Sequence, residues 1–163
     1  MKRIVDALYR VLQIAITLLM GLLIVPVTMQ ILSRYTELIP SYIWTEEVAR
    51  FCFIWIVMLG AMIAVRDGSH FELDVLPHPE TAAGKGWARL IVDVAIALVA
   101  LIFVGYGFPF TSFGADQHSE LTGISMVTIH IAWPLAGLVW LIFLAERLHA
   151  DIRLIQGHAD DAR

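Results

Sequence analysis

The side chains of this chain that could do chemistry are few, and their types exclude most active sites. The chain has six histidines and one cysteine, Cys52, so it can build neither an internal disulfide nor a thiolate metal cluster. It has no phosphate-cradling glycine loop ending in Lys-Ser or Lys-Thr, no zinc-ligand spacing and no Gly-x-Ser-x-Gly elbow. We therefore expect no catalytic residue, no metal site and no cofactor here, and we expect that the protein is not an enzyme.

One histidine, His130, falls inside an apolar segment. Membrane anchors of redox complexes hold haem iron with imidazoles. A bis-histidine site within this chain is disfavoured, because the other histidines fall in loops or at segment ends. Two interpretations stay open: His130 packs inside the protein, or it joins a histidine of another subunit in the membrane anchor of a redox complex.

The elements that position these residues are membrane helices. Of the 163 residues, 59% are hydrophobic and 16% are charged, and the mean hydropathy is +0.77. Soluble proteins carry about 25% charged residues, so we predict an integral, all-α membrane protein. One span takes about 20 residues, which leaves room for a single four-helix domain over residues 1–163. The predicted transmembrane helices cover about 11–32, 48–65, 90–110 and 123–146.

The second of these helices has charged residues at its start. Thr45 is a candidate N-cap, and Glu46 and Glu47 follow in the first turn, where the helix dipole favours carboxylates. Glu46 and Arg50 are four residues apart, which places them on one face and predicts an ion pair.

The far end of the second helix is also charged. Arg66 lies in its last turn, and Gly68 is a candidate C-cap. The sequence Ser-His-Phe-Glu that follows fits a capping box, which predicts a short interfacial helix from about His70 to Leu76. In the third span, Gly105, Gly107 and Pro109 predict that the helix unwinds or bends.

Orientation in the membrane follows from the basic residues, because Lys and Arg concentrate in cytoplasmic loops. Two basic residues, Arg34 and Arg50, lie on the side of the first and third loops, which also carries five acidic residues. The opposite side, with both termini, has nine. They are Lys2, Arg3, Arg10, Arg66, Lys85, Arg89, Arg147, Arg153 and Arg163. We therefore predict cytoplasmic N and C termini and a small, acidic outer face.

The interiors of the predicted spans are nearly free of charge. A self-sufficient transporter needs ionisable or unwound elements near the bilayer midplane, so transport by this chain alone is a weaker alternative. Three tryptophans, Trp55, Trp133 and Trp140, lie inside spans. Either they pack within the helices or against lipid, or they form a surface for a larger membrane protein.

The stretch after the first loop carries a family resemblance. Trp44-Thr45-Glu46-Glu47, Arg50, Phe51, Trp55, Gly60-Ala61, Arg66 and His70-x-x-x-Asp74-x-Leu76 are similar to the motif of a known group of membrane proteins. That group is the DctQ-like family, the small membrane subunit of tripartite ATP-independent periplasmic (TRAP) transporters. The number of spans and the predicted cytoplasmic termini agree with it.

The resemblance implies a non-catalytic subunit of a bacterial inner-membrane symporter. Its partners would be a large multi-span subunit with the sodium and solute sites, a periplasmic binding protein that delivers an organic anion such as a carboxylate, and membrane lipids, with no role for nucleic acid. The small subunit would steady the immobile scaffold of an elevator-like transporter. The residues expected at the partner or lipid interface are Trp44, Glu46, Glu47, Arg50, Trp55, Arg66, His70 and Asp74.

Overall fold

The computed structural model of the chain describes residues 2–36, 40, 42–68, 82–120 and 122–155. In chain order its elements are α1 (Lys2–Tyr35), α2 (Trp44–Asp67), α3 (Ala82–Phe113), the 3-10 helix η2 (Gly114–Asp116), α4 (Val127–His130) and α5 (Ala132–Ile155). Within the described residues, four helical segments are long and apolar enough to cross a membrane, the last of them made of α4 and most of α5. The predicted all-α fold with four membrane helices is confirmed.

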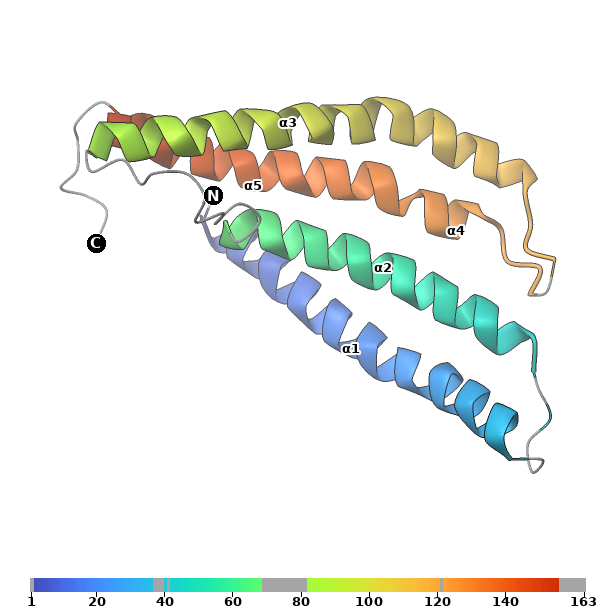
Figure 1. Ribbon diagram of the computed structural model, residues 1–163. Helices are drawn as coiled ribbons and strands as arrows, with labels where there is room; N and C mark the ends of the chain where they lie inside the picture. The colour runs from blue at the N-terminus through green and yellow to red at the C-terminus, as the bar shows by residue number, and fades with distance from the viewer. Residues whose placement is uncertain (1, 37–39, 41, 69–81, 121, 156–163) are drawn as a thin grey trace.

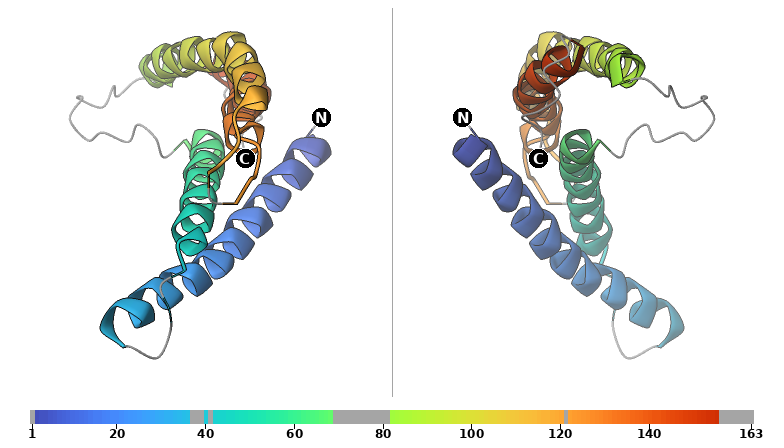
Figure 2. Two further views of the ribbon diagram at one scale, coloured as in Figure 1. Left: turned by 90° about the vertical axis from the view of Figure 1, so that its right-hand side faces the viewer. Right: turned by 90° about the vertical axis from the view of Figure 1, so that its left-hand side faces the viewer.

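The helices follow one another in space in the order α1, α2, α5, α3 (Figure 1). α1 packs against α2, α2 against α5, and α5 against α3. The start of α1 and the end of α5 lie at the same end of the molecule, and Figure 2 shows α1 crossing α2 at an angle. In the most apolar stretch of the last span 56% of the residues are buried, against 11% in α1. α5 therefore forms the centre of the protein, and α1 leaves most of its apolar surface uncovered.

The pairing of α3 with α5 depends on small residues. Ala100 on α3 and Ala132 and Ala136 on α5 are fully buried. A Cβ added to Gly137 would lie 2.7 Å from the carbonyl oxygen of Ala100. A Cβ added to Gly107 would lie 2.9 Å from the backbone nitrogen of Pro134. Small side chains thus allow the two backbones to approach closely, as in many membrane helix pairs.

Proline interrupts the fourth span but not the third. α3 stays helical through Gly105, Gly107 and Pro109 to Phe113 and curves over this half (Figure 1), so the expected unwinding is wrong and the expected bend is seen. The hydroxyl of Thr111 donates to the carbonyl of Gly107 at 2.7 Å, which occupies an oxygen near the proline. In the fourth span, Pro134 has no N–H to donate to the preceding turn. α4 and α5 are accordingly separate helices with a break at Ile131.

The ends of α2 differ from each other in how well the sequence predicted them. The helix begins at Trp44, and Thr45 lies inside it, so Thr45 is not the N-cap. Its hydroxyl instead donates backwards to the carbonyl of Tyr42 at 2.7 Å. Gly68 is the C-cap, with a φ of 71° that suits glycine. The expected interfacial helix, about 70–76, lies outside the described residues.

Candidate functional site

The first turns of α2 present three of the predicted interface residues to the outside. Arg50 Nη2 lies 3.1 Å from Glu46 Oε1, which confirms the predicted ion pair. The side chains of Arg50 and Glu46 are 63% and 71% exposed. The pair therefore lies within one helix and leaves both charged groups accessible to a partner. Trp44 is also exposed and its ring lies 6.2 Å from that of Tyr42.

Glu47, the next residue after Glu46, points inward and is only 8% exposed. Its Oε1 accepts a hydrogen bond from the hydroxyl of Ser119, in the turn between η2 and α4. Its other oxygen is enclosed and makes no hydrogen bond within the described part of the chain. Two adjacent glutamates therefore have different roles, one at the surface and one joining α2 to the turn that follows α3.

Trp55 lies further along α2 and is bound within the chain. Its indole N–H donates to the carbonyl oxygen of Thr128 on α4 at 3.0 Å. Trp55 is half-buried, and Thr128 accepts its N–H at the helical turn that precedes the break before α5. The two other membrane tryptophans pack on Phe103, with ring centroids at 5.0 Å for Trp133 and 5.1 Å for Trp140. Each of the three thus has a contact within the chain, while Trp133 stays 38% exposed.

Arg66, at the other end of α2, is engaged with α1. Its guanidinium donates to the carbonyl of Val5 at 3.1 Å, pairs with the carboxylate of Asp6, and lies 4.4 Å from the ring centre of Tyr9. The hydroxyl of Tyr9 in turn donates to Asp67 at 2.8 Å. Arg66 was expected to form a cluster with His70 and Asp74, and these two lie outside the described residues.

Sequence reasoning missed a second arginine at this end. Arg147 on α5 donates to the carbonyl of Val65 on α2 at 2.8 Å, and its Nη2 lies 3.0 Å from Oδ1 of Asp93 on α3. Asp93 is 2% exposed. The sequence shows that Asp93 and Arg147 both lie near the ends of apolar segments. It does not show that the two residues form an ion pair. Together, Arg66 and Arg147 tie all four membrane helices at one end.

His130 is a packing residue of α4. It is 8% exposed, its ring stacks on that of Phe110 with centroids 4.0 Å apart, and its Nδ1 lies 3.1 Å from the carbonyl oxygen of Phe110. A Cβ at Gly114 would collide with the ring. Of the two interpretations of His130, the geometry agrees with packing.

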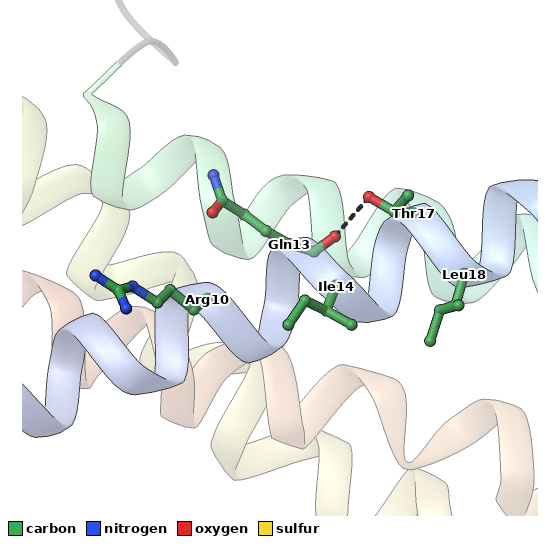
Figure 3. Close-up of a pocket in the computed structure, with 5 residues that line it drawn as sticks. All are labelled: Arg10, Gln13, Ile14, Thr17 and Leu18. Carbon is green, nitrogen blue, oxygen red and sulfur yellow. Dashed lines mark hydrogen bonds between the residues drawn. The ribbon is translucent and has the colours of Figure 1, made fainter.

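Two open hollows lie on the described part of the chain, one on α1 and one between the end of α1 and the start of α2. The first, of about 340 Å³, is lined by α1 alone (Figure 3). Its residues are Arg10, Gln13, Ile14, Thr17 and Leu18. Within the described chain, no three His, Cys, Asp or Glu residues gather as metal ligands would. This arrangement offers four membrane helices that Arg66 and Arg147 join at one end, with Glu47 of α2 bound to Ser119 at the other.

Comparison with known proteins agrees with this arrangement. Residues 23–154 match the family described as tripartite ATP-independent periplasmic transporters, DctQ component. The chain belongs to the DctQ family. Its members are transporter permease subunits of the membrane and not enzymes, which confirms the predicted class. The family gives no support to the alternative of a redox-complex anchor built on His130.

Relatives of this DctQ chain include separate small subunits. It is 26% identical to the sialic acid TRAP transporter small permease protein SiaQ of Vibrio cholerae, over 88% of this chain and 83% of the relative. It is also similar to a putative TRAP transporter small permease protein of Haemophilus influenzae, with 23% identity over 68% of this chain and 69% of that protein.

A further relative is much longer. The sialic acid TRAP transporter permease protein SiaT of Haemophilus influenzae is 30% identical over 68% of this chain, and the match covers 18% of SiaT. In this relative, the part that is similar to the DctQ chain is therefore one segment of a large permease polypeptide.

Proposed function

We propose that this chain is the small permease subunit of a TRAP-type secondary transporter, and that it scaffolds a large multi-span subunit. The observation that carries the proposal is the family match over residues 23–154. The large partner is supported by SiaT, in which a segment similar to this chain belongs to a longer permease. The transported solute is an organic anion, taken up with sodium that binds in the large subunit and delivered by a periplasmic binding protein.

The geometry of the helices supports a scaffolding role. A transporter with a moving part needs a stationary part, and the two arginines join α1, α2, α3 and α5 into one unit at one end. At the opposite end, Glu47 joins α2 to Ser119, and Trp55, midway along α2, donates to the carbonyl of Thr128 on α4. These contacts oppose sliding of α2 past α4 and α5. The charged groups lie near the helix ends, so the path of the solute belongs to the partner.

The proposed place of the subunit is the bacterial inner membrane, with both termini in the cytoplasm. The start of α1 and the end of α5 lie at one end of the molecule (Figure 1), as an even number of spans requires. The excess of Lys and Arg at that end supports the orientation. Reporter fusions to the two termini and to the 114–126 segment test it, because only the termini should report the cytoplasm.

Two groups of residues are proposed to contact the large subunit or lipid headgroups. At the outer end the exposed Trp44, Glu46 and Arg50 are available for a partner. At the cytoplasmic end the proposed contact involves Arg66, His70 and Asp74. Since Arg66 is bound to α1, its part is to fix the helix end from which the following segment starts.

Co-purification with the large subunit tests the proposal. Arg50→Ala and Asp74→Ala should each lower the amount of large subunit recovered on the tagged small subunit and lower uptake in cells. Arg89→Ala, which removes an exposed arginine outside both groups, is the control. Normal co-purification and normal uptake in both variants would remove the partner role of these residues. Solute flux by this chain alone in liposomes would contradict the scaffold itself.

A further inference from the structure

The connection between α3 and α4 forms a small hairpin, which we call the outer hairpin (residues 117–120 and 122–126). The N–H of Ser119 donates to the carbonyl of Ile124, and the N–H of Met126 to that of Gln117, both at 2.9 Å. Gly123 has a φ of 70°, a left-handed conformation that turns the chain back. The hairpin thus has a backbone order of its own, and the N–H of Gln117 connects it to η2 through the carbonyl of Gly114, at 3.3 Å.

The outer hairpin and the residue before it carry two exposed carboxylates. Asp116 and Glu120 are exposed, and His118 lies between them. From Leu90 to Glu146 the chain has no Lys or Arg, so no cation of this long segment neutralises the two carboxylates. Such a surface attracts a soluble partner with a basic patch and speeds its encounter.

Glu47 joins this hairpin to the membrane helices. The carboxylate lies in the first turn of α2, where the helix dipole stabilises it, and it is 8% exposed. It accepts the hydroxyl of Ser119, and Ser119 Oγ accepts the N–H and the hydroxyl of Thr122 at 3.3 and 3.2 Å. A buried, charge-assisted hydrogen bond of this kind is strong and directional. It connects the turn of the hairpin to a rigid helix.

We propose that Glu47 is a positioning residue, which holds the outer hairpin in the direction that presents Asp116 and Glu120 to a basic patch on the soluble periplasmic binding protein. This inference rests on the proposed function, since it needs the hairpin end to face the periplasm and a binding protein to dock there. It assigns to Glu47 a role separate from that of the exposed Glu46. Glu47 itself does not touch the partner and acts through Ser119.

The test is docking of the fluorescently labelled, substrate-loaded binding protein to the two-subunit complex in nanodiscs. Glu47→Ala and Ser119→Ala both remove the hydrogen bond between these residues, and Ser119→Ala also removes the two weaker bonds from Thr122. Each variant should weaken docking about tenfold or more, the effect of a lost bond to a charged group. Glu47→Gln should restore docking, because the amide oxygen still accepts the Ser119 hydroxyl. Ser112→Ala is the matched control, since that hydroxyl bonds to the carbonyl of Pro109 on its own helix.

A combination of variants separates positioning from a general loss of structure. Asp116→Asn with Glu120→Gln should weaken docking and reduce its dependence on salt. Glu47→Ala should then weaken docking no further in this background, because both changes act through one surface. A further tenfold loss there, or docking unchanged in both Glu47→Ala and Ser119→Ala, would overturn the inference. If Glu47→Ala does not assemble with the large subunit, docking to the Ser119→Ala complex tests the inference in its place. A wild-type complex that never binds the soluble protein would instead contradict the proposed function.

Discussion

Arg147 on α5 and Asp93 on α3 form an ion pair at one end of the helices, with Nη2 3.0 Å from Oδ1. The carboxylate is 2% exposed, and the same guanidinium donates to the carbonyl of Val65 at the end of α2. One side chain therefore binds two other helices. Its neighbour in space, Arg66, extends the connection to α1.

Removal of Arg147 should destabilise the protein strongly. Arg147→Ala removes the guanidinium that lies 3.0 Å from the buried carboxylate of Asp93, and loss of one partner of a buried pair costs about 3–5 kcal/mol. The unfolding midpoint in detergent should fall accordingly, and Arg89→Ala, at an exposed arginine, should leave it nearly unchanged. Asp93→Asn combined with Arg147→Met should recover part of the loss. Equal midpoints for Arg147→Ala and Arg89→Ala would contradict the assignment.

The close approach of α3 and α5 predicts a contrast between two glycines. Gly137→Ala places a Cβ 2.7 Å from the carbonyl oxygen of Ala100, so the helices must separate, at a cost of about 1–3 kcal/mol. Gly105→Ala meets nothing within 4 Å and should stabilise α3 by about 0.5–1 kcal/mol. Opposite shifts of the thermal midpoint are the expected result. A destabilisation by both, or by neither, would show that the two helices do not meet as described.

The sequence predicted the helices and their local contacts, because these depend on residues close together in the chain. Length and hydropathy identified four membrane helices, and the spacing of Glu46 and Arg50 identified their ion pair. The glycine after α2 marked its C-cap. Thr45 shows the limit of such rules, since the N-cap is Ile43, two residues before the predicted one, although isoleucine is a poor capping residue.

The contacts that join helices were not predictable in the same way. Glu46 and Glu47 are identical side chains in the same turn, and only the packing of the 114–126 segment on α2 shows that the second is buried against Ser119. Likewise Asp93 and Arg147 are far apart in the chain and meet because α3 packs on α5. A single sequence gives the face of a helix, whereas the partner of that face depends on the whole arrangement.

Trp55 and Trp133 provide a test of the contact between α2 and α4. Trp55→Phe removes the hydrogen bond to the carbonyl of Thr128 and should cost about 0.5–1.5 kcal/mol beyond the lost ring area. Trp133→Phe changes the same atoms in a residue held by ring contacts with Phe103 and Phe110. Unfolding in detergent and SDS mixtures measures both free energies. The smaller loss should belong to Trp133→Phe, and the reverse order would contradict a specific role of the Trp55 indole.

Arg66 should control how firmly α1 is held at the end where it starts. Arg66→Ala removes the donor to the Val5 carbonyl and the ion pair with Asp6, and leaves Tyr9 without its cation. Hydrogen exchange of the amides in residues 5–12 should quicken by about tenfold or more, as the loss of a bond to a charged group implies, with little change in α5.

In Arg66→Lys, the hydrogen exchange of residues 5–12 should be faster than in the wild type and slower than in Arg66→Ala. A lysine keeps the charge but lacks the planar guanidinium that binds the carbonyl and the carboxylate together. The control is Arg10→Ala, which removes an exposed arginine from the same helix. Unchanged exchange in α1 for Arg66→Ala, or a uniform increase in all helices, would show that Arg66 does not fasten α1 to α2. A selective increase would identify the start of α1 as the part of the scaffold that depends on a single side chain.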